Sequence, residues 1–102
     1  MSTGKFLRGV GGEDLDRIAV RFRMLGEPMR LKILQSVCKG SRTVNDIVAA
    51  AGSTQANVSK HLALLAATGI LTREKRGQCV YYGMKDQLVV KLCELVHTHL
   101  AD

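Results

Sequence analysis

The sequence predicts a mainly α-helical single domain with one small β-hairpin, in the order of four helices, two strands and a final helix. Over most of the chain, apolar residues recur at the three- and four-residue spacing of amphipathic helices. Residues 70–83 depart from that spacing, because β-branched and aromatic residues there flank a turn at Arg76-Gly77. With 102 residues and 46% hydrophobic content, the chain can build one modest core.

The first two helices are predicted over Glu13–Leu25 and Met29–Lys39. Pro28 suits the first turn of the second helix, and Gly40 is expected to close it. Residues 1–12 are expected to form a flexible basic tail, which leaves residues 13–102 as the folded domain. The first helix is amphipathic, with apolar residues at i, i+3, i+4, i+7 and i+10: Leu15, Ile18, Ala19, Phe22 and Leu25.

A short third helix and a longer fourth helix are predicted between Thr43 and Gly69. Thr43 begins the short helix, and Asp46 three residues later gives a weak capping box. That helix ends at Ala51-Gly52, after which Ser53 is expected to cap the longer helix and Gly69 to end it. A short helix, a glycine-containing turn and a longer helix with a polar face make a helix-turn-helix motif.

The fourth helix and the strands Ile70–Lys75 and Gln78–Gly83 together predict a DNA-reading surface. A helix fits the major groove, where polar side chains hydrogen-bond base edges or phosphates, and a basic hairpin can follow the backbone. A recognition helix followed by such a wing predicts a winged helix-turn-helix. His61 lies at the edge of the apolar stripe, where packing and a phosphate contact are both open. The predicted DNA-binding residues are Thr54, Gln55, Asn57, Ser59, Lys60, His61, Arg73, Lys75 and Arg76.

Composition supports a nucleic-acid partner and a cytoplasmic location. Fifteen Lys and Arg against nine Asp and Glu give a formal net charge of +6, which suits double-stranded DNA. No apolar run approaches the roughly twenty residues of a membrane span, and Met1–Gly12 lacks the apolar segment of a secretory signal. The three cysteines lack C-x-x-C spacing, so neither a disulfide framework nor a zinc ribbon is expected.

The final helix is expected to begin after Asp86, as its cap, and to run to about Leu100. A terminal helix that is apolar over more than half its surface usually packs against its own domain and a partner. The first helix is its expected neighbour, and a homodimer is the expected assembly. One apolar face of the final helix carries Leu88, Leu92, Leu95 and His99. The other carries Val89, Cys93, Val96 and Leu100.

Three segments, E-P-M-R-L-K-I-L, T-Q-A-N-V-S-K-H-L-A-L-L and G-Q-C-V-Y-Y, resemble the ArsR-type (arsenic-repressor-like) winged-helix regulators. The resemblance covers roughly Leu15 to Leu100. It implies a homodimer built on the first and last helices that binds a palindromic operator, usually as a repressor. It also implies release from DNA when a metal ion, thiol oxidant or other signal is sensed. The matching DNA-facing positions are Gln55, Asn57, Ser59, Lys60, Arg73, Lys75 and Arg76.

The metal-binding patterns that the resemblance implies do not match this chain fully. The third-helix Cys-x-Cys pattern falls on residues 42–48, which contain no cysteine. The last-helix pattern, D-x-H followed by H-x-x-H or H-x-x-E, finds Asp86, His99 and Asp102, but Leu88 replaces the first histidine. The alternative is that Asp86 only caps the helix and His99 packs at the dimer seam.

Helical spacing gives a different candidate sensor. Cys93 and His97 lie at i, i+4 with Asp86 two turns earlier, and a dimer could complete a zinc-like site. A thiol switch between Cys38 and Cys93 is the other candidate, although dithiol members of the family have their cysteines near Gln35 and Ala101. Cys79 is expected to be a small buried hydrophobe. The sequence does not identify a cofactor: the candidates are a transition metal such as zinc, with Asp86, Cys93, His97 and His99 as candidate ligands, or none.

Two other classes of protein are less compatible with the sequence. An enzyme is excluded because we find no Ser-His-Asp order, glycine-rich phosphate loop or paired buried carboxylates. A winged-helix module that binds another protein, without an inducer site, is the alternative. It would predict a neutral or acidic recognition helix, whereas this one carries Lys60 beside a basic wing.

Overall fold

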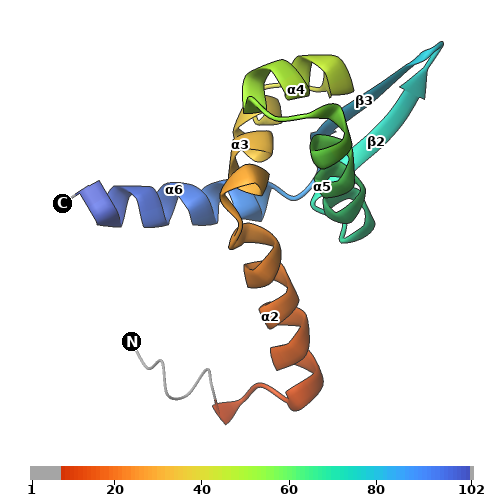
Figure 1. The fold of residues 1–102 in the computed structure, drawn as a ribbon. Coiled ribbons are helices and arrows are strands. Elements are labelled where there is room, and N and C mark those ends of the chain that lie inside the picture. Colours follow the sequence, from red (N-terminus) through yellow and green to blue (C-terminus); the bar gives the residue numbers. More distant parts are fainter. Residues whose placement is uncertain (1–7, 102) are drawn as a thin grey trace.

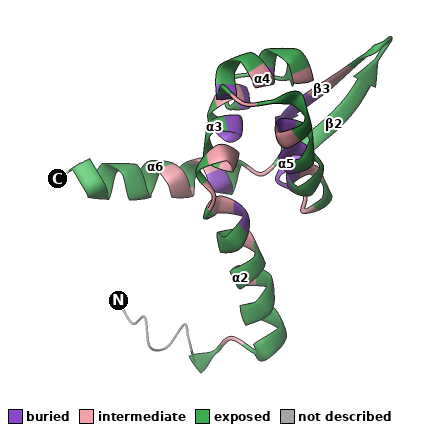
Figure 2. Ribbon diagram, viewed as in Figure 1, coloured by how far each residue is buried: buried purple, intermediate pink, exposed green. Residues whose placement is uncertain are grey.

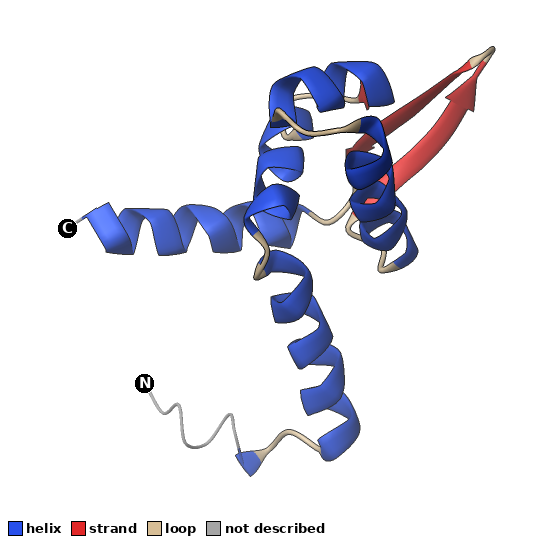
Figure 3. Ribbon diagram, in the orientation of Figure 1, coloured by secondary structure: helices blue, strands red, loops and turns tan. Residues whose placement is uncertain are grey.

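The computed structural model describes residues 8–101, so most of the tail predicted over residues 1–12 lies outside the described residues. The predicted mainly helical fold with a β-hairpin wing is confirmed (Figures 1 and 3). The elements are α2 (Gly12–Leu25), α3 (Pro28–Val37), β1 (Arg42–Thr43), α4 (Val44–Ala51), α5 (Gln55–Ala67), β2 (Leu71–Arg76), β3 (Cys79–Met84) and α6 (Gln87–Ala101).

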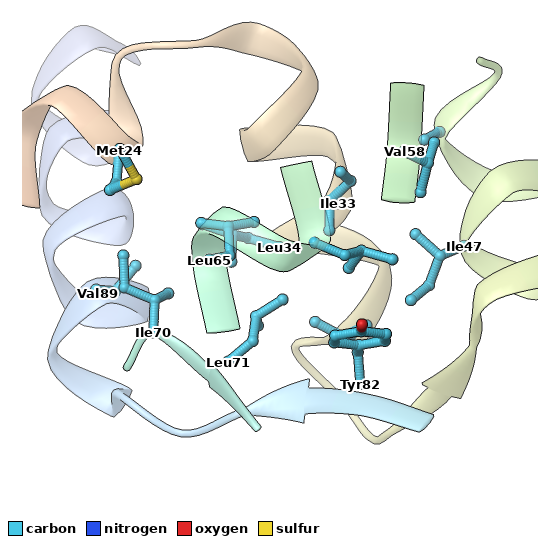
Figure 4. Packing of buried hydrophobic residues seen from close by; sticks show 13 residues of the cluster. Met24, Ile33, Leu34, Ile47, Val58, Leu65, Ile70, Leu71, Tyr82 and Val89 are labelled. Carbon is cyan, nitrogen blue, oxygen red and sulfur yellow. The ribbon is translucent and has the colours of Figure 1, made fainter. Parts of the chain in front are cut away.

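The core lies where α3, α4, α5 and the sheet meet (Figure 4). Tyr82 of β3 closes its sheet side, and Met24 and Val89 anchor the ends of α2 and α6. Full burial of one such apolar side chain stabilises the fold by about 1.5–3 kcal/mol. The core therefore holds the helix-turn-helix as one rigid unit. Its most buried side chains are Ile33, Val37, Ile47, Val58, Leu62, Leu65 and Ile70.

The short helix α4 is bounded as predicted. The Thr43 hydroxyl accepts a hydrogen bond from the Asp46 backbone N–H at 3.2 Å. At the other end, Gly52 has φ 68°, a left-handed conformation that glycine adopts without strain. Gly69, after α5, likewise has φ 79° and confirms the expected end of that helix.

Two predicted helix ends are wrong. Thr54, not Ser53, caps α5, because its hydroxyl accepts from the Asn57 N–H at 3.2 Å. Two adjacent hydroxyl residues satisfy the capping preference equally, so residue type could not separate them. Helix α3 ends at Val37 rather than at Lys39. Gly40 does not end it in a left-handed conformation, because the described glycines with positive φ are Gly52, Gly69 and Gly77.

The sheet has the antiparallel order β1-β3-β2. Arg76 pairs with Cys79, so the wing turns at Gly77-Gln78, one residue later than predicted. Gly77 takes φ 61°, which a tight hairpin turn requires. Strand β1, which pairs Arg42 with Tyr82, was not predicted, because a strand of two residues is too short to show alternation.

Helices α2 and α6 extend away from the core in different directions (Figure 1), and most of their length is exposed (Figure 2). Within one protomer the two helices therefore do not pack along their length, and the expectation that the first helix is the neighbour of the last stays a prediction for the dimer. An amphipathic pattern indicates that the apolar face of a helix is buried, but not whether it is buried in its own protomer or in a partner. The exposed apolar side chains on these helices include Leu15, Phe22, Leu88, Leu95, Val96 and Leu100. Within residues 8–101, no helix has the length and hydropathy of a membrane span.

Candidate nucleic-acid interface

The outer face of α5 is polar and carries a positive charge. Val58, Leu62 and Leu65 face the core, so the opposite side of the helix is turned to solvent. Ser59 and Lys60 are exposed away from the core stripe, and Gln55 is exposed in the first turn of the helix. Their exposure is what base or phosphate contact requires, and contact with DNA stays a prediction for each of them.

The side chains of Thr54 and Asn57 are partly used within the protein. The Thr54 hydroxyl caps the helix, and the Asn57 amide donates to the Ser53 hydroxyl at 3.0 Å. Asn57 is half-buried as a result, whereas Thr54 remains exposed. Their hydrogen bonds fix the first turn of α5, so we assign Asn57 a supporting role in presenting Gln55.

His61 points into the protein rather than toward DNA. Its side chain is only 8% exposed, and its Nδ1 accepts a hydrogen bond from Arg30 Nε at 3.1 Å. Because an arginine Nε always carries its proton, His61 Nδ1 must be the unprotonated nitrogen. Arg30 also donates to the Arg23 carbonyl oxygen at 3.3 Å. The structure therefore supports the packing alternative, and we remove His61 from the predicted DNA contacts.

The wing carries its cations on two faces. On one face Arg76 pairs with Glu74 at 2.5 Å and lies over the Tyr81 ring, 4.6 Å from its centroid. Arg73 and Lys75 alternate onto the other face, and no described acidic side chain forms an ion pair with either. Arg73 and Lys75 therefore present charge without an ion-pair partner, whereas Arg76 forms a solvent-exposed ion pair with Glu74.

Three residues near this surface were missed by the sequence reasoning. Ala56 and Ala63 are exposed on the outer face of α5, where small side chains let the helix approach a partner closely. Helical spacing from the buried Val58 would have found both. Arg42 is exposed in β1, next to the wing, and its position depended on a strand that the sequence did not reveal.

The cysteines separate into two environments. Cys38 at the end of α3 and Cys93 of α6 line one apolar groove between α2, α3 and α6, and His97 lines it too. Burial raises the pKa of the Cys93 thiol above its ordinary value, which keeps it protonated at neutral pH. Cys79 lies exposed on the wing, so its expected burial is wrong. Cys79 directly follows the hairpin turn at Gly77-Gln78, at the tip of the wing, and so lies outside the core.

Comparison with known proteins identifies the family. The model described as "Bacterial regulatory protein, arsR family" matches residues 27–73, which hold α3, α4, α5 and the start of the wing. A probable mercury resistance operon repressor from Streptomyces lividans is 37% identical over 87 residues, covering 85% of this chain and 70% of that protein. The chain belongs to the ArsR family.

Solved structures agree with that assignment. A homodimeric winged helix-turn-helix DNA-binding domain from Mycobacterium bovis, Mb0332, superposes with a TM-score of 0.76 at 29% identity, covering 85% of this chain and 81% of that one. Among the sequence relatives, the transcriptional repressor SmtB of Mycobacterium tuberculosis is 35% identical over 74 residues. The match covers 72% of this chain and 55% of that protein. As an ArsR-family member, the chain is a DNA-binding transcriptional regulator and not an enzyme.

The candidate metal ligands of this ArsR-family chain do not converge within one protomer. Among residues 8–101, no three His, Cys, Asp or Glu side chains come together as a metal site. Both oxygens of Asp86 are engaged, one by the Leu88 N–H at 3.1 Å and the other by Arg21 at 3.3 Å. His97 and His99 are exposed, and Asp102 lies outside the described residues. Asp86 thus caps α6 as predicted, and its part in a metal site stays a prediction.

Proposed function

We propose that this ArsR-family chain is a homodimeric repressor that binds a palindromic operator and leaves it when a metal ion or thiol-reactive signal is sensed. The observation that carries the proposal is the exposed face of α5, with Gln55, Ser59 and Lys60, beside a wing that presents Arg73 and Lys75. Relatives named as repressors support the direction of regulation. A transcriptional regulator of this bacterial family works in the cytoplasm.

Dimerisation is supported by the apolar surface on α2 and α6. Leu88 and Leu95 are each 69% exposed, although isolated domains rarely leave a contiguous apolar helix face in water. Phe22 on α2 is similarly exposed. The homodimeric Mycobacterium bovis domain supports a second copy of the chain as the cover for these faces.

Operator binding is expected to be sequence-specific and strongly salt-dependent. Selection from a random duplex library should enrich a two-fold symmetric site. The binding constant for that site should fall with salt at a slope of roughly −0.9 per neutralised phosphate in log K against log salt. Failure to enrich any sequence, or binding that is independent of salt, would instead favour a protein-interaction module.

Signal sensing is proposed to use the groove that Cys38, Cys93 and His97 line. The groove adjoins α6, so a ligand there can change how two protomers meet. Release requires a differential affinity: a signal that weakens DNA binding must itself bind more weakly when DNA is bound. Zinc-like ions coordinated across the dimer, or oxidation of the two thiols, are the two forms of signal that these side chains support.

Cys93→Ser is expected to preserve operator binding and to abolish its response to zinc or to a thiol oxidant.

Because the pKa of Cys93 is raised by burial, its alkylation by iodoacetamide should be slow at neutral pH and accelerate as pH rises. Metal affinity should also increase with pH, since a bound thiol must lose its proton. The measurements are operator titrations with and without signal, and alkylation rates followed by mass spectrometry.

Cys79→Ser is the matched control, because Cys79 lies exposed on the wing and is not among the residues that line the groove. It should retain the full response. A Cys93→Ser protein that still releases DNA normally would place the sensor elsewhere and leave Cys93 with a packing role.

A further inference from the structure

Arg21 joins three helices at one point. Its Nη1 donates to the carbonyl oxygen of Thr68 at 2.7 Å, and its Nη2 lies 3.3 Å from Asp86 Oδ2. Arg21 belongs to α2, Thr68 is the C-cap of α5, and Asp86 precedes α6. One side chain therefore connects the exposed helix α2 both to the recognition helix and to the start of the last helix.

The charges at this junction match the helix ends that they face. The C-terminal end of α5 carries partial negative charge, which favours the Arg21 guanidinium, and the N-terminal end of α6 favours the Asp86 carboxylate. Asp86 Oδ1 also accepts the Leu88 N–H at 3.1 Å. The planar guanidinium can serve both partners at once because its donors form a rigid fork.

Backbone hydrogen bonds tie the same point to the end of the recognition helix. The N–H groups of Lys85 and Asp86 both donate to the Ile70 carbonyl oxygen, at 3.0 and 3.2 Å. Asp86 is therefore fixed next to the chain that leaves α5, and Arg21 is the side chain that brings α2 to this fixed point. At its C-terminal end α2 also packs on the core through Met24 and the partly buried Leu25, and the Arg23 carbonyl oxygen accepts from Arg30 of α3.

We propose that Arg21 is a positioning residue that sets the angle between the DNA-reading unit, α5 with the wing, and the helices α2 and α6. This inference rests on the proposed dimer. In a dimer held by α2 and α6, that angle determines the distance between the two recognition helices. Arg21 would therefore control which half-site spacing the protein accepts, without contacting DNA.

The test compares Arg21→Gln with Arg17→Gln. Both substitutions remove one positive charge from α2, but the Arg17 side chain is 78% exposed and pairs only with Asp14 at 3.7 Å, one turn away. Each protein is titrated against the selected operator and against copies with one base pair inserted or deleted between the half-sites. Dimerisation is checked by sedimentation, and unfolding by circular dichroism.

We expect Arg21→Gln to remain a folded dimer while its preference for the native spacing over the altered spacings falls roughly threefold to tenfold. Arg17→Gln should keep the preference of the unsubstituted protein. Asp86→Asn, which retains a capping oxygen but loses the charge, should reproduce the Arg21→Gln result. Adding it to Arg21→Gln should cause little further change, because the two residues act as a unit.

Equal spacing preferences for Arg21→Gln and Arg17→Gln, with the Asp86→Asn preference also unchanged, would overturn the inference. That result is distinguishable from failure of the proposed function. In the latter case the unsubstituted protein would itself show no dimer, or no preference among operators, before any variant is compared.

Discussion

Leu95→Glu is expected to convert the protein to a folded monomer and to remove most of its operator affinity. The Leu95 side chain is 69% exposed in one protomer, so the substitution should cost the isolated fold little. In the proposed dimer the same position is covered by the partner. A carboxylate buried there without a counter-charge costs about 3 kcal/mol or more, which corresponds to a roughly 100-fold weaker dimer.

Sedimentation and operator titration at the same protein concentration measure both consequences. Thr98→Glu is the control, because Thr98 lies on the polar face of α6 and receives the identical new side chain. It should remain dimeric and bind the operator normally. If Leu95→Glu sedimented as a dimer, the exposed face of α6 would not be the interface.

The fold was predictable because its signals are local. Single residues mark several helix ends: the Thr43 hydroxyl caps the start of α4, and the left-handed Gly52 and Gly69 end α4 and α5. The packed stripe of α5 follows from the spacing of Val58, Leu62 and Leu65. By contrast, β1 forms only because residues 42–43 meet β3 in space. No pattern within a two-residue segment could indicate that.

The candidate sites were less predictable because their partners are distant in sequence. His61 falls at a buried helical spacing from Val58, so its burial had a signal, but its hydrogen bond to Arg30 had none. Asp86 was predicted as a helix cap, whereas its ion pair with Arg21, 65 positions earlier in the chain, had no local signal. The side chain of Lys60 was easier to place, because exposure on a helix follows from its period, and Gln55 is exposed because it begins the helix.

Gln55→Ala is expected to reduce the preference for operator over random DNA by about 1–3 kcal/mol, if the amide reads one base through two hydrogen bonds. Gln55 is the first residue of α5, and its exposed side chain stands at the end of the helix that is proposed to enter the major groove. Alanine retains helix propensity, so the loss should appear in specificity rather than in stability. Competitive titration with operator and random duplexes measures the ratio.

Arg73→Ala provides the contrasting result, because an uncompensated wing cation positions the backbone and reads no base. It should weaken binding to operator and to random DNA by similar factors. The slope of log K against log salt should become shallower by about 0.9, the contribution of one phosphate. Arg76→Ala should act in the same direction but more weakly, since Glu74 already balances its charge. If Gln55→Ala left the operator-to-random ratio intact, base readout would have to come from Ser59, Lys60 or the small residues Ala56 and Ala63 on the same exposed face.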